Sequence, residues 1–390
     1  MTKVNRKMRM GMIGGGKGAF IGGVHRLAAN LDGEITLVCG AFSRDPQKSK
    51  ESGEEMYLSP ERVYGTYQEM IDSEKEISEG ERMDFVSIVT PNHMHFAPAK
   101  YALENGFPVV IDKPLTFSYE ESKELLKLVK ETGLLFGLTH TYTGYPMIKE
   151  AKELIKSGKL GKIRRVVAEY QQGWLSTKLE DGDQKQADWR TDPTRSGKAG
   201  CMGDIGTHAE NLAEYVTGLK VKELCADLTA FVEGRRLDDD GNVLLRFNNG
   251  AKGVLFASQV AAGVENAIRL RVYGELGGLE WSHEDLNTLI VRWLDKPAEI
   301  LRTGVNYTNL SDRSLINTRV PAGHPEGYLE AFANIYRNFA KTLKARMNGE
   351  SIDNEAYDFP TVEEGVRGMA FIDAVVESNE KGSVWVKINE

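Results

Sequence analysis

The chain contains little cysteine, no long apolar run and no long basic run. Three cysteines, Cys39, Cys201 and Cys225, are scattered among 390 residues, which excludes a disulfide framework or a zinc ribbon and favours a reducing compartment. No stretch approaches the length of a membrane span, and no separate apolar segment with a cleavage site precedes the first expected strand. We therefore expect a cytoplasmic protein without a membrane partner. A net charge of −8 argues against nucleic acid as the main partner.

A glycine-rich loop follows the first expected strand, residues 8–13. The loop reads Gly14-Gly15-Gly16-Lys17-Gly18-Ala19 and matches G-x-G-x-x-A, in which glycines permit a tight turn and let the backbone approach a pyrophosphate. A helical segment at 25–30 and a second strand at 34–42 complete a βαβ unit, the context that this motif requires. The loop is longer than the minimal form because residues 20–23 are inserted, which leaves individual contacts open. The residues predicted to bind the dinucleotide here are Gly14, Gly16, Gly18, Ala19 and Phe20.

The end of the second strand bears on the choice between NAD and NADP. Sites that select NAD place a carboxylate there for the ribose 2′-hydroxyl, whereas an arginine accepts a 2′-phosphate. This chain has Ser43-Arg44, with Asp45 one residue later. Ser43 and Arg44 favour NADP, but Arg44 could instead lie over the adenine and Asp45 could supply the carboxylate. We predict NAD(P) as the cofactor, with a slight preference for NADP.

Two more apolar runs, at 85–89 and 108–111, resemble buried strands of a parallel sheet, and each ends in a polar turn. Ligands bind at such carboxyl ends. The first turn contains two histidines in an H-x-H spacing, but no cysteine or carboxylate pattern completes a metal site, so we predict no metal. The second turn carries a lysine that packing explains poorly, because Lys is rarely buried unless paired, although a solvated loop lysine is the common alternative. The predicted cofactor-binding residues in these turns are Thr90, Pro91, Asn92, His95, Asp112 and Lys113.

The stretch Gly203-Asp204-Ile205-Gly206-Thr207-His208 precedes an apolar helical pattern. If the stretch is helical, Asp204 and His208 project from one face, because they are four residues apart. A histidine can then take a proton from a substrate hydroxyl while the carboxylate fixes its tautomer and stabilises the imidazolium. The alternative is that Asp204 caps the helix and His208 is an ordinary helix residue.

In combination, these motifs resemble the Gfo/Idh/MocA family, named after glucose-fructose oxidoreductase, inositol dehydrogenase and rhizopine catabolism. The residues that carry the resemblance are the glycine loop, Thr90-Pro91-Asn92-x-x-His95, Asp112-Lys113-Pro114 and Gly203-Asp204-x-x-x-His208. The resemblance implies an α/β protein: an N-terminal Rossmann domain, and a C-terminal α/β domain with a large, open, mostly antiparallel sheet. We predict these domains at residues 1–144 and 145–390, the second binding substrate and forming the oligomer, with a C-terminal segment that could pack back on the first domain.

The expected elements after residue 144 agree with this architecture. Helices are expected at 147–156, 325–347 and 362–379, and a hairpin at Asn248-Asn249-Gly250. Strands are expected at 163–172, 223–233, 242–247, 251–261, 267–274 and 384–388.

By the same resemblance, the catalytic triad is Lys113, Asp204 and His208. His208 would be the general base, Asp204 its orienting partner, and Lys113 a positive charge that stabilises the developing alkoxide and positions the nicotinamide ribose. The chain departs from the family at Asp112, where glutamate is usual, so the ribose contact of this shorter carboxylate is less secure.

The expected reaction is hydride transfer between nicotinamide and a secondary ring hydroxyl of a sugar, glycoside or inositol. Aromatic and amide side chains suit stacking on a sugar face and bonding its hydroxyls, although each of them could equally be a core or interface residue. The alternatives are a redox-neutral epimerase or glycoside-cleaving enzyme with retained cofactor, and a non-catalytic dinucleotide-dependent sensor. A homodimer or homotetramer is expected. The candidate substrate-binding residues are Tyr142, Gln172, Trp174, Trp189, Arg190 and His324.

Overall fold

The computed structural model describes residues 3–388 and divides the chain into two compact units. The first unit comprises the residues up to Gly144 together with Tyr328–Val366. The second comprises Tyr145–Gly327 together with the residues from Arg367 onward. The long helix α12 (Val362–Glu380) begins in the first unit and continues in the second. Among the described residues, no helix is both long and apolar enough to cross a bilayer.

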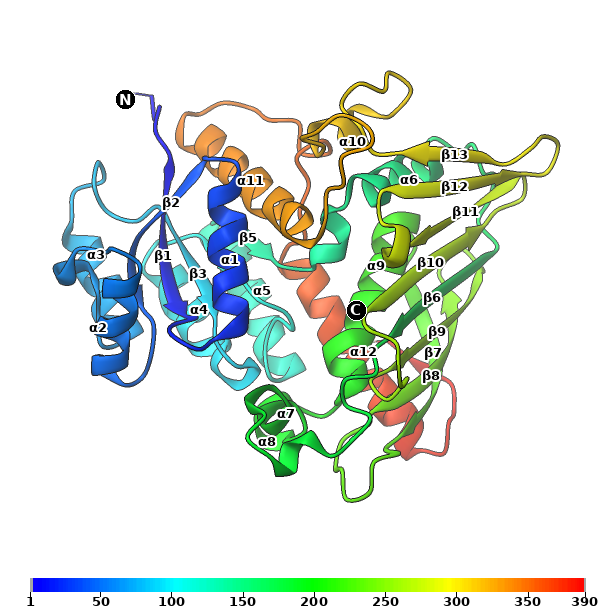
Figure 1. The fold of residues 1–390 in the computed structure, drawn as a ribbon, viewed down its shortest axis with the longest axis horizontal. Helices are drawn as coiled ribbons and strands as arrows, with labels where there is room; N and C mark the ends of the chain where they lie inside the picture. The colour runs from blue at the N-terminus through cyan, green and yellow to red at the C-terminus, as the bar shows by residue number, and fades with distance from the viewer. Residues whose placement is uncertain (1–2, 389–390) are drawn as a thin grey trace. The chain divides into compact units, whose positions relative to one another are not determined.

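The first unit is built on a five-stranded, wholly parallel sheet in the order β2-β1-β3-β4-β5 (Figure 1). Its strand order changes direction at β1, so the carboxyl ends of β1 and β3 form the topological switch point at which such sheets bind ligands. The strands are β1 (Met8–Gly14), β2 (Ile35–Ala41), β3 (Phe85–Val89), β4 (Val109–Ile111) and β5 (Phe136–Leu138).

Helices cover both faces of this sheet. The side chains of Met8, Met10 and Met12 pack with α11 residues in one buried cluster, and α1 contacts α11 along this face. On the opposite face, a Cβ on Gly11 would meet Met70 of α3. Alternate residues of β1 therefore face different helical layers, as expected for a strand buried on both sides. The helices are α1 (Phe20–Leu31), α2 (Pro46–Glu55), α3 (Tyr67–Glu76), α4 (Phe96–Glu104), α5 (Tyr119–Thr132) and α11 (Tyr328–Met347).

The second unit contains a nine-stranded sheet in the order β13-β12-β11-β10-β6-β9-β8-β7-β14. The pairs are antiparallel except β6 with β9, which run parallel. This confirms the predicted fold class, a parallel Rossmann sheet followed by a mostly antiparallel one. The strands are β6 (Arg165–Gln171), β7 (Val221–Thr229), β8 (Asp240–Phe247), β9 (Lys252–Ser258), β10 (Ala267–Tyr273), β11 (Gly277–Ser282), β12 (Thr288–Trp293), β13 (Glu299–Arg302) and β14 (Val386–Lys387).

Helices α6 (Pro146–Lys156) and α9 (Thr207–Thr217) pack on one another and on strands of this sheet. Figure 1 shows them, with α12, on the same side of the sheet. The shorter helices are α7 (Lys185–Arg190), α8 (Pro193–Ser196) and α10 (Asp312–Ile316). The predicted hairpin at residues 248–250 joins β8 to β9. Residues 275–324, to which the sequence analysis assigned no element, contain β11, β12, β13 and α10.

Candidate functional site

The glycine-rich loop joins β1 to α1 and has the backbone that the phosphate motif requires. Gly14, Gly15 and Gly18 have φ of 80°, 69° and 77°, which L-residues rarely adopt. A Cβ on Gly22 would lie 2.3 Å from the Cα of Gly15. Gly22, which the sequence pattern placed in an insertion, thus allows the close approach of helix to strand that a fingerprint glycine provides. A Cβ on Gly18 would meet nothing within 4 Å, so this backbone is open to a ligand and fits a pyrophosphate.

After β2, Asp45 is the N-cap residue of α2. Its Oδ1 accepts hydrogen bonds from the backbone N–H groups of Gln47 (3.0 Å) and Lys48 (3.4 Å) and thereby caps α2. The Ser43 hydroxyl oxygen accepts a bond from the Asp45 N–H (3.1 Å), and Arg44 is exposed. The carboxylate that could hold an adenosine ribose is therefore engaged with the helix that follows it.

The turns after β3 and β4 are tied together by His95. This histidine is fully buried, and its Nδ1 and Nε2 lie 2.7 Å and 2.8 Å from the carbonyl oxygens of Pro114 and Thr90. Burial lowers the pKa of His95. Asn92 is also buried, in a short 3₁₀ turn. The geometry gives His95 a bridging position between two turns predicted to hold the cofactor.

Asp112 anchors the backbone that carries Lys113. Its Oδ1 accepts bonds from the Lys113 N–H (2.8 Å) and from the hydroxyl of Thr139 at the end of β5 (2.9 Å). Burial by itself raises the pKa of Asp112, but His25, Lys113 and His95 hold that pKa below its usual range. Asp112 is thus an ionised group beneath the predicted catalytic lysine, which is itself only partly exposed.

His140 and Tyr142 follow β5 and are both buried. Burial, with the nearby charge of Lys113 adding to it, lowers the pKa of His140 to about 3. His140 is therefore neutral at physiological pH. Tyr142 lies in a short 3₁₀ segment, Thr141–Gly144, at the end of the first part of this unit.

In the second unit, the helix that carries Asp204 and His208 starts with a π-helical turn, Met202–Gly206, and continues as α9. Its first backbone N–H groups are capped by Asp238, which precedes β8. The two oxygens of the Asp238 carboxylate accept bonds from Gly200 N (2.6 Å) and Met202 N (2.8 Å). Burial raises the pKa of Asp238 to about 6. Because Asp238 caps this helix, the carboxylate of Asp204 is available for other contacts.

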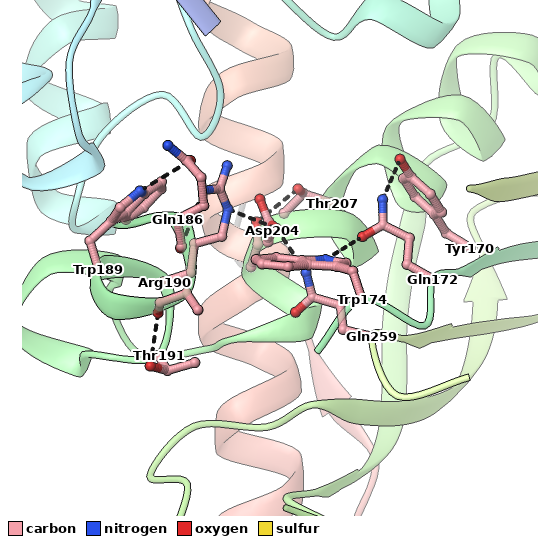
Figure 2. Close-up of polar contacts among 12 residues, drawn as sticks. Tyr170, Gln172, Trp174, Gln186, Trp189, Arg190, Thr191, Asp204, Thr207 and Gln259 are labelled. Atoms are coloured by element: carbon pink, nitrogen blue, oxygen red, sulfur yellow. Dashed lines mark hydrogen bonds and ion pairs between the residues drawn. The ribbon is translucent and has the colours of Figure 1, made fainter. Parts of the chain in front are cut away.

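Two polar side chains hold the Asp204 carboxylate from outside the helix (Figure 2). Arg190 of α7 donates from Nε to Oδ2 (3.2 Å), and Gln259, which follows β9, donates from Nε2 to the same oxygen (2.9 Å). Arg190 is held in turn by Gln186 and lies over the ring of Trp189, 4.2 Å from its centre. The sequence analysis placed Arg190 and Trp189 among substrate-binding residues but did not find Gln186 or Gln259.

An array of aromatic and amide side chains lies on β6 and in the segment that follows it; Figure 2 shows Gln172 between Tyr170 and Trp174. The ring of Tyr170 lies 6.2 Å from that of His208, which is 8% exposed. Asn266 Oδ1 accepts bonds from the Tyr170 hydroxyl (2.7 Å) and from Gln172 Nε2 (2.8 Å), and the indole N–H of Trp174 donates to Gln172 Oε1 (3.0 Å). The structure therefore brings Gln172 and Trp174 together and adds Asn266, which no local motif indicated.

His324 differs from the other candidates for substrate binding. It is exposed in the loop before α11, where its Nδ1 lies 3.3 Å from the carbonyl oxygen of Pro321.

Lys113 and the glycine loop belong to the first unit, whereas Asp204, His208 and the aromatic-amide array belong to the second. Within residues 3–388, no three His, Cys, Asp or Glu side chains are grouped as metal ligands.

Comparison with known proteins assigns both units. Residues 8–140 match the oxidoreductase family with an NAD-binding Rossmann fold (GFO_IDH_MocA), and residues 148–280 match the GFO/IDH/MocA C-terminal domain. An uncharacterised oxidoreductase of Bacillus subtilis is 34% identical over 98% of both chains. This chain belongs to the Gfo/Idh/MocA family. The family is an oxidoreductase family with an NAD-binding Rossmann fold, and the resemblance drawn from the motifs is confirmed.

Structures of two relatives of this Gfo/Idh/MocA protein contain a bound dinucleotide, alone or with a cyclic polyol or anhydro sugar. An inositol dehydrogenase homologue from Azotobacter vinelandii, solved with NAD⁺, has a TM-score of 0.92 at 34% identity over 99% of both chains. An inositol dehydrogenase homologue from Azotobacter vinelandii in complex with NADH and myo-inositol has a TM-score of 0.89 at 33% identity over 99% of both chains. Levoglucosan dehydrogenase of Pseudarthrobacter phenanthrenivorans is 26% identical over 98% of both chains. A levoglucosan dehydrogenase complex with NADH and levoglucosan has a TM-score of 0.82 at 25% identity, over 99% of this chain and all of the other.

Proposed function

We propose that this family member is an NAD-dependent dehydrogenase that oxidises a secondary ring hydroxyl of a cyclic polyol, an anhydro sugar or another monosaccharide derivative. The observation that carries the proposal is the environment of Asp204. Its carboxylate is left uncommitted by the helix cap and is held by Arg190 and Gln259, on the same helix as His208. A helix-capping role for Asp204 does not account for these contacts.

In this proposal, His208 accepts the proton of the substrate hydroxyl at a ring nitrogen. Asp204 orients the imidazole and stabilises its charged form. Lys113 provides a positive charge for the alkoxide that develops as the proton leaves. Bound NAD supplies the hydride acceptor, which is the chemistry of the cofactor itself. The 8% exposure of His208 limits water at the base.

The residues proposed to hold the dinucleotide are those of the glycine loop and of the turns after β2, β3 and β4. The structures of the relatives described above are complexes with NAD⁺ or NADH. The slight preference for NADP drawn from Ser43-Arg44 finds no support in them, and we propose NAD. Arg44 is then free to lie along the adenosine instead of binding a 2′-phosphate, which is the alternative placement stated above.

The aromatic-amide array supports a hydroxyl-rich substrate. Trp174 offers a ring face, and Gln172 and Asn266 offer amide groups that already bond one another. Such groups suit the apolar face and the hydroxyls of a cyclic polyol. The named substrates of the two relatives, myo-inositol and levoglucosan, are both of this class.

The homodimer or homotetramer expected from the sequence stays a prediction. One cross-strand row of the nine-stranded sheet is apolar at both ends and charged in the middle: Leu244, Val254, Val167, Arg271, Glu280, Ile290 and Ile300. Leu244 is 49% and Ile300 66% exposed. Exposed apolar residues in such a row support association of two copies. Light scattering coupled to size-exclusion chromatography would measure the mass; a monomer at all concentrations would contradict this prediction.

The test is reduced-nicotinamide absorbance with purified protein, NAD⁺ or NADP⁺, and a panel of inositols, anhydro sugars, hexoses and methyl glycosides. We expect a signal with NAD⁺ and a cyclic polyol or sugar. We expect His208→Ala to lower kcat by roughly a hundredfold or more while NAD⁺ binding is retained. Silence across the panel, in protein that binds NAD⁺, would favour a redox-neutral enzyme or a sensor. Normal turnover by His208→Ala would refute the role of His208.

A further inference from the structure

A buried histidine of α1 lies behind the turn that carries Lys113. His25 has no exposed surface, and its Nδ1 is 2.7 Å from the hydroxyl oxygen of Tyr336 on α11. That hydroxyl is also 2.7 Å from the hydroxyl oxygen of Ser87 on β3. The other ring nitrogen, Nε2, faces Asp112 Oδ1 at 3.9 Å. Among residues 3–388 this nitrogen has no hydrogen-bond partner, so an unsatisfied polar atom points at the carboxylate.

One arrangement of this hydrogen-bond chain puts the proton of His25 on Nε2. Burial raises the pKa of Tyr336, so the phenol remains protonated and can donate to His25 Nδ1. A neutral imidazole that accepts at Nδ1 carries its proton on Nε2, the atom that faces Asp112. Ser87 can donate to the Tyr336 oxygen and complete the chain.

Asp112 is the link from His25 to the predicted catalytic lysine. Its Oδ1 accepts from the Lys113 backbone N–H and from the Thr139 hydroxyl, which fixes the peptide from which the lysine side chain extends. We propose that His25 is a positioning residue for Lys113: its Nε2–H faces Asp112 Oδ1 across 3.9 Å, and this electrostatic contact favours the carboxylate orientation that fixes the Lys113 peptide. The proposal rests on the role given to Lys113 under the proposed function.

Packing is the alternative explanation for His25. Its ring meets Phe332 with centroids 4.6 Å apart and Tyr336 with centroids 5.8 Å apart, both edge to face. If His25 served only this aromatic cluster, phenylalanine would replace it well and glutamine poorly. If its Nε2–H acts on Asp112, glutamine, whose amide N–H reaches a similar position, would preserve function better than phenylalanine. The two roles therefore predict opposite orders of activity.

The experiment compares His25→Phe and His25→Gln with the unsubstituted protein. We measure kcat, KM for the substrate found in the panel, NAD⁺ affinity without substrate, and urea unfolding. We expect His25→Phe, in protein that remains folded under the assay conditions, to lose at least about tenfold in kcat. We expect His25→Gln to keep kcat within about threefold even where its midpoint falls. The reverse order, with His25→Phe active and His25→Gln impaired, would overturn the proposal.

A second measurement needs no turnover. His25→Phe is made with and without Asp112→Asn, and the unfolding equilibrium constants are compared in protein free of NAD. We expect the effect of His25→Phe to differ at least about fivefold between the two backgrounds; equal effects would overturn the link to Asp112. Lys113→Ala separates this inference from the proposed function. Normal activity of Lys113→Ala would refute the role of Lys113, whereas an inactive Lys113→Ala with a fully active His25→Phe would refute only that of His25.

Discussion

The close approach of Gly22 to Gly15 gives a sharp test of the dinucleotide loop. A Cβ added at Gly22 would lie 2.3 Å from Gly15 Cα and 2.4 Å from its carbonyl oxygen, whereas ordinary carbon contacts are about 3.5–4.0 Å. The substitution Gly22→Ala therefore pushes the start of α1 away from the loop by more than about 1 Å. The neighbouring Gly23 is a matched control, because a Cβ there would meet nothing within 4 Å.

Both substitutions replace a glycine of α1 by alanine and so change helix propensity equally, but only Gly22→Ala introduces a steric clash. Replacing a helical glycine by alanine stabilises a helix by about 0.5–1 kcal/mol, so Gly23→Ala is expected to be neutral or slightly stabilising. Overpacking costs about 1–3 kcal/mol, so Gly22→Ala is expected to be less stable than Gly23→Ala by about that amount. The affinity for NAD⁺ should fall at least about tenfold in Gly22→Ala alone, because the displaced backbone lines the predicted pyrophosphate site.

The assays are urea unfolding and NAD⁺ titration of both variants beside the unsubstituted protein. The decisive quantity is the difference between Gly22→Ala and Gly23→Ala, since any general effect of a methyl group on α1 cancels. If the two variants unfold at the same urea concentration and bind NAD⁺ equally, the argument that Gly22 permits the helix to approach the loop is wrong.

Three further predictions concern charge and substrate contacts. The pKa of His140 is about 3 in the folded protein and 6.5 in the unfolded chain. The neutral histidine therefore contributes fully to stability above pH 6.5, and this contribution is lost as the pH falls toward 3. Lowering the pH from 7 to 5 should reduce the free energy of unfolding by about 2 kcal/mol through His140. Urea unfolding at both pH values should show a smaller loss in His140→Gln, and an equal loss would contradict the assignment. Gln259→Leu removes one donor from Asp204, so kcat should fall about tenfold with NAD⁺ affinity unchanged; unchanged kcat would mean that Arg190 alone suffices. Trp174→Phe removes the N–H that bonds Gln172 and reduces the aromatic surface, so KM should rise about two- to tenfold at constant kcat. Unchanged steady-state kinetics would indicate that the array lies outside the substrate site.

The Rossmann part of the fold was predictable because its signals are local. A strand, a glycine loop and a helix in immediate succession specify the β1-loop-α1 unit, since positive φ at Gly14, Gly15 and Gly18 is a property of the backbone itself. The buried strands β3 and β4 were likewise visible as short apolar runs. In contrast, β11 to β13 were missed: β11 begins with two glycines and β13 has mostly exposed residues, so their strand character comes from pairing with neighbours.

The candidate site was predictable in its residue types and less so in its contacts. The spacing of Asp204 and His208 suggested a base with its carboxylate, but it left open whether Asp204 caps the helix. The capping of that helix by Asp238 resolved the question. Gln259 and Asn266 belong to no motif, because their partners are distant in sequence: Gln259 follows β9 and meets Asp204 in the π-helical turn, and Asn266 precedes β10 and meets Tyr170 on the paired strand β6.

The sequence by itself determined the family, the two kinds of sheet and the glycine-rich loop, and it supplied the titratable residues that we propose for proton transfer. These follow from backbone preferences and from the residue types that the chemistry needs, which adjacent residues are enough to express. Only the tertiary structure decided which carboxylate caps a helix, which one Arg190 and Gln259 hold, and which buried histidine faces Asp112. Those assignments depend on long-range contacts, because a polar group removed from water must find its partner wherever the fold places one.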